Sequence, residues 1–451
     1  MVVVCWAQSQ RLQRTAVLSG ALFLPAWGAR GVRVAAARPP HAPPAPPGAA
    51  LLPLPAAPPA VLALPPLHTA CPSCVWRRMT CVRATGAELD SYLVVCRGAP
   101  AMVQALALDA AHAGWEPLVP ATRVARPTAA DVDLAAGWLY YCDVHRYEIS
   151  RQRLDGSEHE VFLSEDVDNC EGIAIDPIGR NVYWTDDTLG RVSVARLGDA
   201  TRRRVLVHEP HYNPRAIALD PPNGVMYWSV WASAVTARGR IETANMDGSR
   251  RRTLLDSDLH WPNGLAYHQD TDTLYWCDTY LNKIERLRLR ADGRHERELV
   301  ARDEPAAPLR KPYGLALYEG AVVWSEHGTG SVRRLRDGRV TQLAALAPPL
   351  YDIRLVSRTA AIVYECVLRD AGGNLCAHEN GGCEELCLAV SGGHVCACAG
   401  ERALAADGRA CVPRAPGTPH EPRAPRCPPG QFHCKRGYHL IVIPGIYWVV
   451  R

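Results

Sequence analysis

A tandem repeat with steps of 43 to 48 residues, a turn dipeptide within each repeat and six cysteines crowded into one C-terminal stretch predict an all-β protein. A period of this length is typical of propellers, in which each repeat folds as one four-stranded blade. Densely spaced cysteines indicate a small module that is held together by disulfides rather than by a large core. We therefore expect a six-bladed β-propeller followed by a small disulfide-rich module.

The first 90 residues precede the repeats and differ from them in composition. Residues 1–70 are rich in Ala, Pro and Leu, and such a segment is expected to be an extended, largely disordered leader. Within it, Arg11 and Arg14 precede an apolar stretch at 15–27, a pattern compatible with a secretory signal segment.

An aromatic motif defines the repeat and recurs five times in the propeller region, which we place at residues 91–366. The second residue of the motif stands at positions 140, 183, 227, 275 and 323, so the steps are 43, 44, 48 and 48 residues. The five motifs are Leu139-Tyr140-Tyr141-Cys142-Asp143, Val182-Tyr183-Trp184-Thr185-Asp186, Met226-Tyr227-Trp228-Ser229-Val230, Leu274-Tyr275-Trp276-Cys277-Asp278 and Val322-Val323-Trp324-Ser325-Glu326.

A hairpin signal follows each motif. Asp-Gly between apolar runs is a strong hairpin signal because Gly tolerates positive φ. With an apolar strand ahead of each motif, every unit is predicted to contain four antiparallel strands. The flanks at 92–108 and 351–364 are expected to pair as the sixth blade and close the ring. The turn dipeptides are Asp155-Gly156, Gly198-Asp199, Asp247-Gly248, Asp292-Gly293 and Asp337-Gly338.

The motif residues are expected to be structural. Tyr and Trp on a central blade strand pack between blades, and the Asp two residues after the Trp is expected to cap backbone N–H groups of a neighbouring turn. Catalytic carboxylates would converge on one spot, whereas these recur once per blade. The residues concerned are Tyr140, Asp143, Tyr183, Trp184, Asp186, Tyr227, Trp228, Tyr275, Trp276, Asp278 and Trp324.

Charge and motifs argue against several classes of function. The formal net charge of +4 is small, and the arginine runs at 202–204 and 250–252 are expected to be solvated turns, so nucleic acid is not an expected partner. No apolar run reaches the roughly 18 to 20 residues of a membrane span. The propeller region contains no H-E-x-x-H, His-x-His, G-x-S-x-G or phosphate-loop motif, so we expect no catalytic residue, metal or cofactor.

The five motifs, together with Trp261-Pro262-Asn263-Gly264 and Asn213-Pro214-Arg215-Ala216, resemble the YWTD (class B) repeats of low-density lipoprotein receptor-related proteins. The resemblance is strongest to the very large members of that family and covers residues 78–434. Residues 372–412 resemble an EGF-like domain, which implies the disulfides Cys376–Cys387, Cys383–Cys396 and Cys398–Cys411. Residues 71–90, with Cys74 and Cys81, resemble the end of another EGF-like module.

Residues 427–451 begin like a class A repeat and then diverge. Cys427 and Cys434 match its opening, but four further cysteines and the acidic residues that would cage calcium do not follow. We expect a truncated repeat, and a non-functional truncated product is therefore an alternative to a working receptor module. Four other cysteines have no obvious partner and are expected to be buried free thiols, with one extra disulfide as the alternative: Cys142, Cys170, Cys277 and Cys366.

One residue per blade is expected at a common rim of the channel, just before each innermost strand. These positions hold Thr128, Glu171, Arg215, Asn263 and Tyr313, which differ in charge and size as ligand-reading residues would. The resemblance implies that this face binds protein or peptide ligands, and that the position matching Asn263 contacts a ligand asparagine in some relatives. Our hypothesis is a peptide-binding mouth formed by Glu171, Arg215, Trp261, Asn263 and Tyr313, and the alternative is loop residues without a ligand.

The sequence thus predicts a monomeric, non-enzymatic ligand-binding module of an endocytic receptor, whose partner is an extracellular protein or peptide. We expect it outside the cell or in the secretory pathway, and at the cell-surface membrane if it belongs to a longer receptor. One alternative is a propeller for pH-dependent ligand release, with histidines in or near turns at His145, His208, His211, His260 and His327. A more distant one is a calcium-dependent lactonase-like propeller, which would require Glu and Asn side chains converging in the central channel.

Overall fold

The computed structural model describes residues 91–108, 118–233, 237–305, 308–357, 375–400 and 402–414, and the backbone of two more strands. The chain divides into two compact units. One contains the hairpin of β28 (His439–Ile443) and β29 (Ile446–Val450), and the other contains everything described below. The expected leader, the upstream EGF-like remnant and Cys366 lie outside the described residues.

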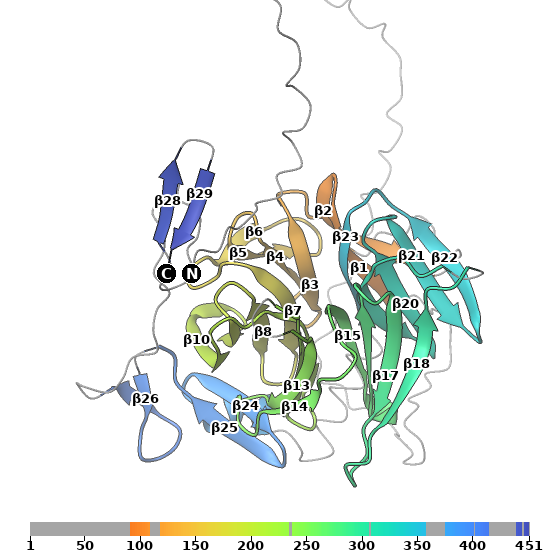
Figure 1. Cartoon of the computed structure of the whole chain (residues 1–451). Coiled ribbons are helices and arrows are strands. Elements are labelled where there is room, and N and C mark those ends of the chain that lie inside the picture. Colours follow the sequence, from red (N-terminus) through yellow and green to blue (C-terminus); the bar gives the residue numbers. More distant parts are fainter. Residues whose placement is uncertain are drawn as a thin grey trace, which may run out of the picture. The chain divides into compact units, whose positions relative to one another are not determined.

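Five four-stranded antiparallel sheets follow one another in chain order around a ring (Figure 1). Each sheet runs from an inner strand at the centre of the ring to an outer strand at its edge. The sheets are β3 (Pro127–Asp133) to β4 (Trp138–Asp143), β5 (Glu148–Arg153) and β6 (His159–Leu163); β7 (Cys170–Asp176) to β8 (Asn181–Asp186), β9 (Arg191–Arg196) and β10 (Asp199–His208); β11 (Pro214–Asp220) to β12 (Val225–Val230), β13 (Arg240–Asn245) and β14 (Arg252–Leu255); β15 (Pro262–His268) to β16 (Thr273–Asp278), β17 (Lys283–Arg288) and β18 (Glu296–Arg302); and β19 (Pro312–Tyr318) to β20 (Ala321–Glu326), β21 (Ser331–Arg336) and β22 (Arg339–Ala345).

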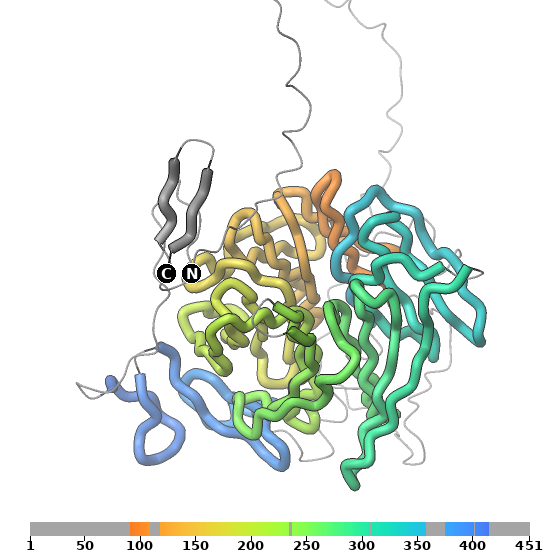
Figure 2. Tube along the Cα trace, viewed as in Figure 1, coloured from red at the N-terminus to blue at the C-terminus, as the bar shows by residue number. Residues whose placement is uncertain are grey.

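The sixth blade joins both flanks of the repeat region and confirms the predicted six-bladed fold. Strand β1 (Ser91–Gly98) pairs on one side with β2 (Ala101–Ala107) and on the other with β23 (Leu350–Ser357), which is the inner strand. Figure 2 shows the trace of β1 and β2, in orange, next to that of β23. Ala121 forms a bridge to Val103 at the outer side of this blade.

The motif strands form the core between the blades. Trp184, Trp228, Trp276 and Trp324 are all buried, as are Tyr140 and Tyr183, and only Tyr275 among the named motif aromatics is more than slightly exposed. Truncation of a buried Trp in such a core costs about 3 to 5 kcal/mol.

The motif carboxylates bind backbone N–H groups of the links that enter and leave each blade. Asp143 accepts N–H groups from Ala125 and Arg126 ahead of β3, and others from the turn after β4. Asp278 does the same for His260 and Trp261 and for the turn after β16. Each carboxylate therefore fixes two loops at the same rim of the propeller.

The fourth motif residue connects neighbouring blades. In the fifth blade, Ser325 accepts the N–H of Gly314 and donates to Tyr351 O on the next inner strand. Thr185 likewise donates to Arg215 O, and Cys277 to Tyr313 O. Inner strands can approach this closely because the residue opposite is small: a Cβ on Gly264 would lie 2.7 Å from Tyr313 O.

In the first blade this connection is covalent. Cys142, at the same motif position, forms a disulfide with Cys170, the first residue of β7. The expectation that both are free thiols is therefore wrong. The inner strands of the other four repeats begin with proline (Pro127, Pro214, Pro262 and Pro312), and Cys170 replaces it where the strand start faces Cys142. Cys277 is a buried free thiol, as expected, and so is Cys96.

The C-terminal module consists of two short β-hairpins. They are β24 (Leu386–Val390) with β25 (Gly393–Ala397), and β26 (Arg402–Leu404) with β27 (Cys411–Pro413), preceded by short 3-10 turns at Leu375–Ala377 and Glu379–Gly382. Its disulfides are Cys376–Cys387, Cys383–Cys396 and Cys398–Cys411, the same pairs that the resemblance implies.

This module packs against the second and third blades. Leu386, Leu388 and Ala389 belong to the same apolar cluster as Tyr183 and Met226. Asn181 Nδ2 donates to Cys387 O at 2.8 Å, and Ser391 Oγ donates to Asn245 Oδ1 at 3.0 Å.

The first arginine run differs from the expected solvated turn, whereas the second is exposed at the turn ahead of β14. Arg202 and Arg204 on β10 donate to backbone carbonyls of the module, while Arg203 pairs with Glu165 and Asp166. In the second run Arg251 pairs with Glu209 and Glu242.

Candidate functional site

The five rim residues occupy one equivalent position, the second residue of each inner strand. Sequence reasoning placed them just before the strands, and the structure shows that they already belong to β3, β7, β11, β15 and β19. Thr128 is buried and donates to Cys170 O at 2.7 Å, so it connects two blades and does not face a ligand. The other four, Glu171, Arg215, Asn263 and Tyr313, line one central cavity of about 20 Å³.

An ion-pair network fills one side of this cavity. The Arg215 guanidinium lies 2.5 Å from Glu171 and 3.0 Å from Asp187. Its Cζ atom also lies 3.6 Å from the centroid of the Trp231 ring. Burial raises the pKa of Glu171, and Arg215 opposes this effect as its main ion-pair partner. Arg215 is therefore held between two carboxylates and an indole at the centre of the mouth.

Asn263 lies on the other side and connects the third, fourth and fifth blades. Its Oδ1 accepts the indole N–H of Trp231 at 2.8 Å, and its Nδ2 donates to Thr279 Oγ1. Thr279 in turn donates to Pro312 O. An amide has two donor hydrogens and two acceptor lone pairs, so these bonds leave one donor and one acceptor of Asn263 for a ligand.

Trp261 belongs to a group of four rings at the rim. We call Trp231, His260, Trp261 and Tyr280 the aromatic ridge. The Trp231 and Trp261 rings stack with centroids 5.1 Å apart, and Tyr280 contacts both His260 and Trp261. Tyr280 is 56% exposed, unusually high for a large aromatic side chain.

The sequence-based hypothesis of a peptide-binding mouth included Trp261 but not Trp231 or Tyr280. Both follow the motif strand directly, since Trp231 comes after Val230 and Tyr280 is the second residue after Asp278. In a four-stranded blade, the loop after the second strand opens on the same rim as the start of the first. This relation between loops and rims was the sequence signal that could have pointed to Trp231 and Tyr280.

Tyr313 stands in a second ring cluster with His327 and Tyr351. The Tyr313 and His327 rings stack at 5.2 Å, and Tyr351 meets both edge-on. Burial lowers the pKa of His327 below its ordinary value, and Lys311 and Arg126 add to the effect. A lowered pKa means that His327 takes up a proton only at a lower pH than a free histidine does, which does not favour it as the switch of the pH-release alternative.

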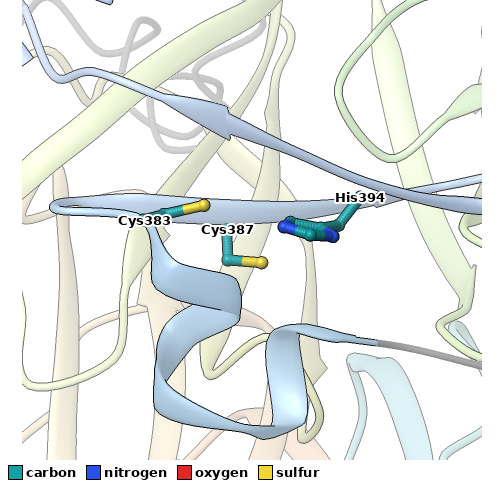
Figure 3. A group of neighbouring side chains, drawn as sticks. All are labelled: Cys383, Cys387 and His394. Carbon is teal, nitrogen blue, oxygen red and sulfur yellow. The ribbon is translucent and has the colours of Figure 1, made fainter. Parts of the chain in front are cut away.

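Two side-chain groups have the composition of metal sites, and neither is one. Cys383, Cys387 and His394 lie together in the C-terminal module (Figure 3), as do Glu385, Cys398 and Cys411. All four cysteines are committed to disulfides, which removes the thiolates that a metal would need. His394 Nε2 is also engaged with Gly381 O at 3.0 Å.

A calcium-dependent lactonase site does not fit the central channel. Glu171 and Asn263 do converge there, as such a site would require. However, the cation beside Glu171 is already supplied by Arg215, and Asn263 is bound to Trp231 and Thr279. The cavity has room for about one water molecule.

Comparison with known proteins gives matches to both domains. Residues 376–411 match the family model described as coagulation factor Xa inhibitory site. Residues 130–347 match the model described as SMP-30/gluconolactonase/LRE-like region. In the part of the chain that the structure describes, no helix is long and apolar enough to cross a membrane.

Individual relatives cover mainly the propeller. The vitellogenin receptor Yl of Drosophila melanogaster is 30% identical over 263 residues, which make up 57% of this chain and 12% of that receptor. A chain of the nidogen/laminin complex is 26% identical, with a TM-score of 0.51 over 59% of this chain and 98% of that chain. A gluconolactonase of Xanthomonas campestris is 20% identical with a TM-score of 0.42, over 50% of this chain and 78% of that chain, too distant to bear on activity.

Proposed function

We propose that this chain is a member of the low-density lipoprotein receptor-related family and forms the ligand-binding module of an extracellular endocytic receptor, which takes protein or peptide ligands at the mouth of its propeller. It spans 12% of the related vitellogenin receptor, so the endocytic role belongs to the proposal as well. The propeller relative in the nidogen/laminin complex supports a protein ligand. The module itself is non-enzymatic in this proposal.

One comparison within the chain carries the proposal. In the five repeats the second residue of the inner strand is Thr128, Glu171, Arg215, Asn263 or Tyr313, whereas the third is Ala or Gly. The third position is constrained because inner strands touch there, as the contacts of Gly264 show. In four of the five repeats the second position lines the central cavity, and it varies in charge and size. Such variation next to a constrained position is expected of a surface that binds a specific ligand.

The mouth also has the composition of a binding hot spot. Trp, Tyr and Arg dominate such spots because they combine large contact areas with hydrogen bonds. Trp231, Trp261, Tyr280 and Arg215 provide these residue types around the central cavity.

The test is to secrete the full chain and screen it against a displayed peptide library and laminin. Each ligand found is then measured by surface plasmon resonance with the variants Trp261→Ala and Leu299→Ala. Trp261 lies in the aromatic ridge, and Leu299 is an exposed apolar residue on outer strand β18. We expect Trp261→Ala to weaken binding at least tenfold, as for a hot-spot residue, and Leu299→Ala to leave it unchanged. Equal binding by both variants would contradict a ligand site at the mouth.

A further inference from the structure

Four exposed cationic side chains lie on one side of the propeller mouth. Arg123 and Arg126 lie in the link that leads into β3, and Arg310 and Lys311 in the link that leads into β19. We call these four residues the basic arc. The inner strand between β3 and β19 around the ring is β23, so both links flank the sixth blade.

Direct contacts connect the two halves of the basic arc. His327 N donates to Lys311 O at 3.0 Å, and Leu350 N donates to His327 O at 3.2 Å. The His327 ring meets that of Tyr351, and Arg126 Cζ lies 5.9 Å from the Tyr351 centroid. The cations therefore border a floor formed by the rings of Tyr313, His327 and Tyr351.

Within the described residues, no carboxylate forms an ion pair with the basic arc. The carboxylates of Asp143 and Glu326 lie under the two links, but both are buried and bind backbone N–H groups, including those of Arg126 and Arg310. Asp303 similarly accepts the N–H of Leu309. The positive charge of the arc is left facing solvent.

The acidic side of the same rim is partly neutralised within the protein, because four carboxylates share two arginines. Glu165 and Asp166 ahead of β7 pair with Arg203, and Asp187 after β8 pairs with Arg215. The cations over the sixth blade therefore have no ion-pair partner among the described residues, whereas these carboxylates near the second blade are all ion-paired. A partner with negative charge over the sixth blade is favoured, since complementary charge speeds association and fixes orientation.

We propose that the basic arc binds an acidic segment of a protein ligand, with an aromatic or apolar side chain of that segment packed on the rings of Tyr313, His327 and Tyr351. This inference rests on the proposed function and extends the mouth from the aromatic ridge to the opposite side. A peptide is favoured over a sulfated polysaccharide because the rings beside the cations can accommodate an aromatic or apolar side chain, which a sulfated polysaccharide does not have.

The probe is a fluorescein-labelled dodecapeptide of repeated Glu-Glu-Tyr, and its partner is the same peptide with Gln in place of Glu. Binding to the full secreted chain is followed by fluorescence anisotropy between 50 and 500 mM salt, and a labelled heparin fragment serves as the polysaccharide probe. The test variant is Arg126→Gln with Lys311→Gln. Its matched control is Arg294→Gln with Arg339→Gln, two exposed arginines at the hairpins on the opposite rim, after β17 and β21.

We expect the test variant to bind the Glu probe roughly tenfold more weakly, at about threefold for each exposed pair, while the control variant binds it as the wild type does. The Gln probe should bind at least tenfold more weakly than the Glu probe, and added salt should weaken only the Glu probe. Equal binding of Glu and Gln probes, equal binding by test and control variants, or no binding of the Glu probe would overturn the proposal. Heparin binding that depends on the basic arc, without binding of the Glu probe, would overturn it in favour of a polysaccharide.

Failure of this inference can be separated from failure of the proposed function. If a screened ligand is lost in Trp261→Ala but unaffected in the basic-arc variant, the receptor function stands and the acidic segment does not. If no ligand depends on either side of the mouth, both are wrong.

Discussion

Removal of the disulfide between the first two blades should destabilise the propeller by a predictable amount. Cys142 and Cys170 are 28 residues apart in sequence, and a cross-link over a loop of that length is worth about 3.5 kcal/mol from the entropy of the unfolded chain. The double variant Cys142→Ser with Cys170→Ser should lose about that much. For a domain of this size, the urea midpoint should fall by roughly 1 M.

The chain provides a matched control for this experiment. Cys277 occupies the same motif position in the fourth blade but is a free thiol, which donates to Tyr313 O and accepts the N–H of Gly264. Ser325 makes the same two kinds of bond in the fifth blade. Cys277→Ser should therefore cost less than about 1 kcal/mol, because the hydroxyl can replace both bonds.

The assay is urea unfolding of the secreted, oxidised chain, followed by tryptophan fluorescence. Peptide mass mapping without reduction should recover Cys142 and Cys170 in one cross-linked fragment. The reasoning is refuted if the double variant and Cys277→Ser unfold at the same urea concentration. Quantitative alkylation of both cysteines in the native wild type would refute it as well.

Three further predictions concern the packing of the module, a buried carboxyl group and the mouth. Gly224→Ala should detach the C-terminal module from the propeller, because the new Cβ would lie 2.5 Å from backbone atoms of Val390. Limited proteolysis should then cleave between the two domains faster in this variant than in the control Gly198→Ala, where a Cβ has open space. Burial raises the pKa of Asp176 to about 6 from 3.8, so its favourable contribution to folding is complete below pH 4 and is lost as the pH rises through 6. Asp176→Asn should therefore raise the melting temperature relative to wild type at pH 8, by the equivalent of up to about 3 kcal/mol, and much less at pH 4. An equal difference at both pH values would contradict a raised pKa of Asp176. Arg215→Met should leave Glu171 buried beside Asp187 without its cation, and should lower the free energy of chemical unfolding by about 3 kcal/mol. The paired change Arg215→Met with Glu171→Gln should restore part of this stability.

The fold could be predicted from the sequence because its signals are local. Each motif strand and each glycine turn can be predicted from the residues of a single repeat. The glycines of the Asp-Gly turns do adopt positive φ, for example +75° at Gly156 and +86° at Gly248. The paired flanks of the sixth blade follow from the need to close the ring.

The site was only partly predictable because it depends on contacts between repeats. Glu171, Arg215, Asn263 and Tyr313 do line one cavity, as the equivalent positions suggested. That Arg215 is neutralised by Asp187, and that Trp231 covers it, depends on how one blade is rotated relative to the next. One extra disulfide was only the alternative in the sequence analysis, and its pair could not be named, since Cys142 and Cys170 belong to different blades and face each other only in the assembled ring.

The closing strand has a consequence for biosynthesis. Strand β1 begins at Ser91, but the partner that completes its sheet, β23, ends at Ser357, which the ribosome adds 266 residues later. At 5 to 20 residues per second, that interval is about 13 to 53 s. For all of this time β1 has an apolar edge with unpaired N–H and C=O groups, although the blades between are already made. The sixth blade, and with it the ring, can therefore close only after all five repeats have been synthesised.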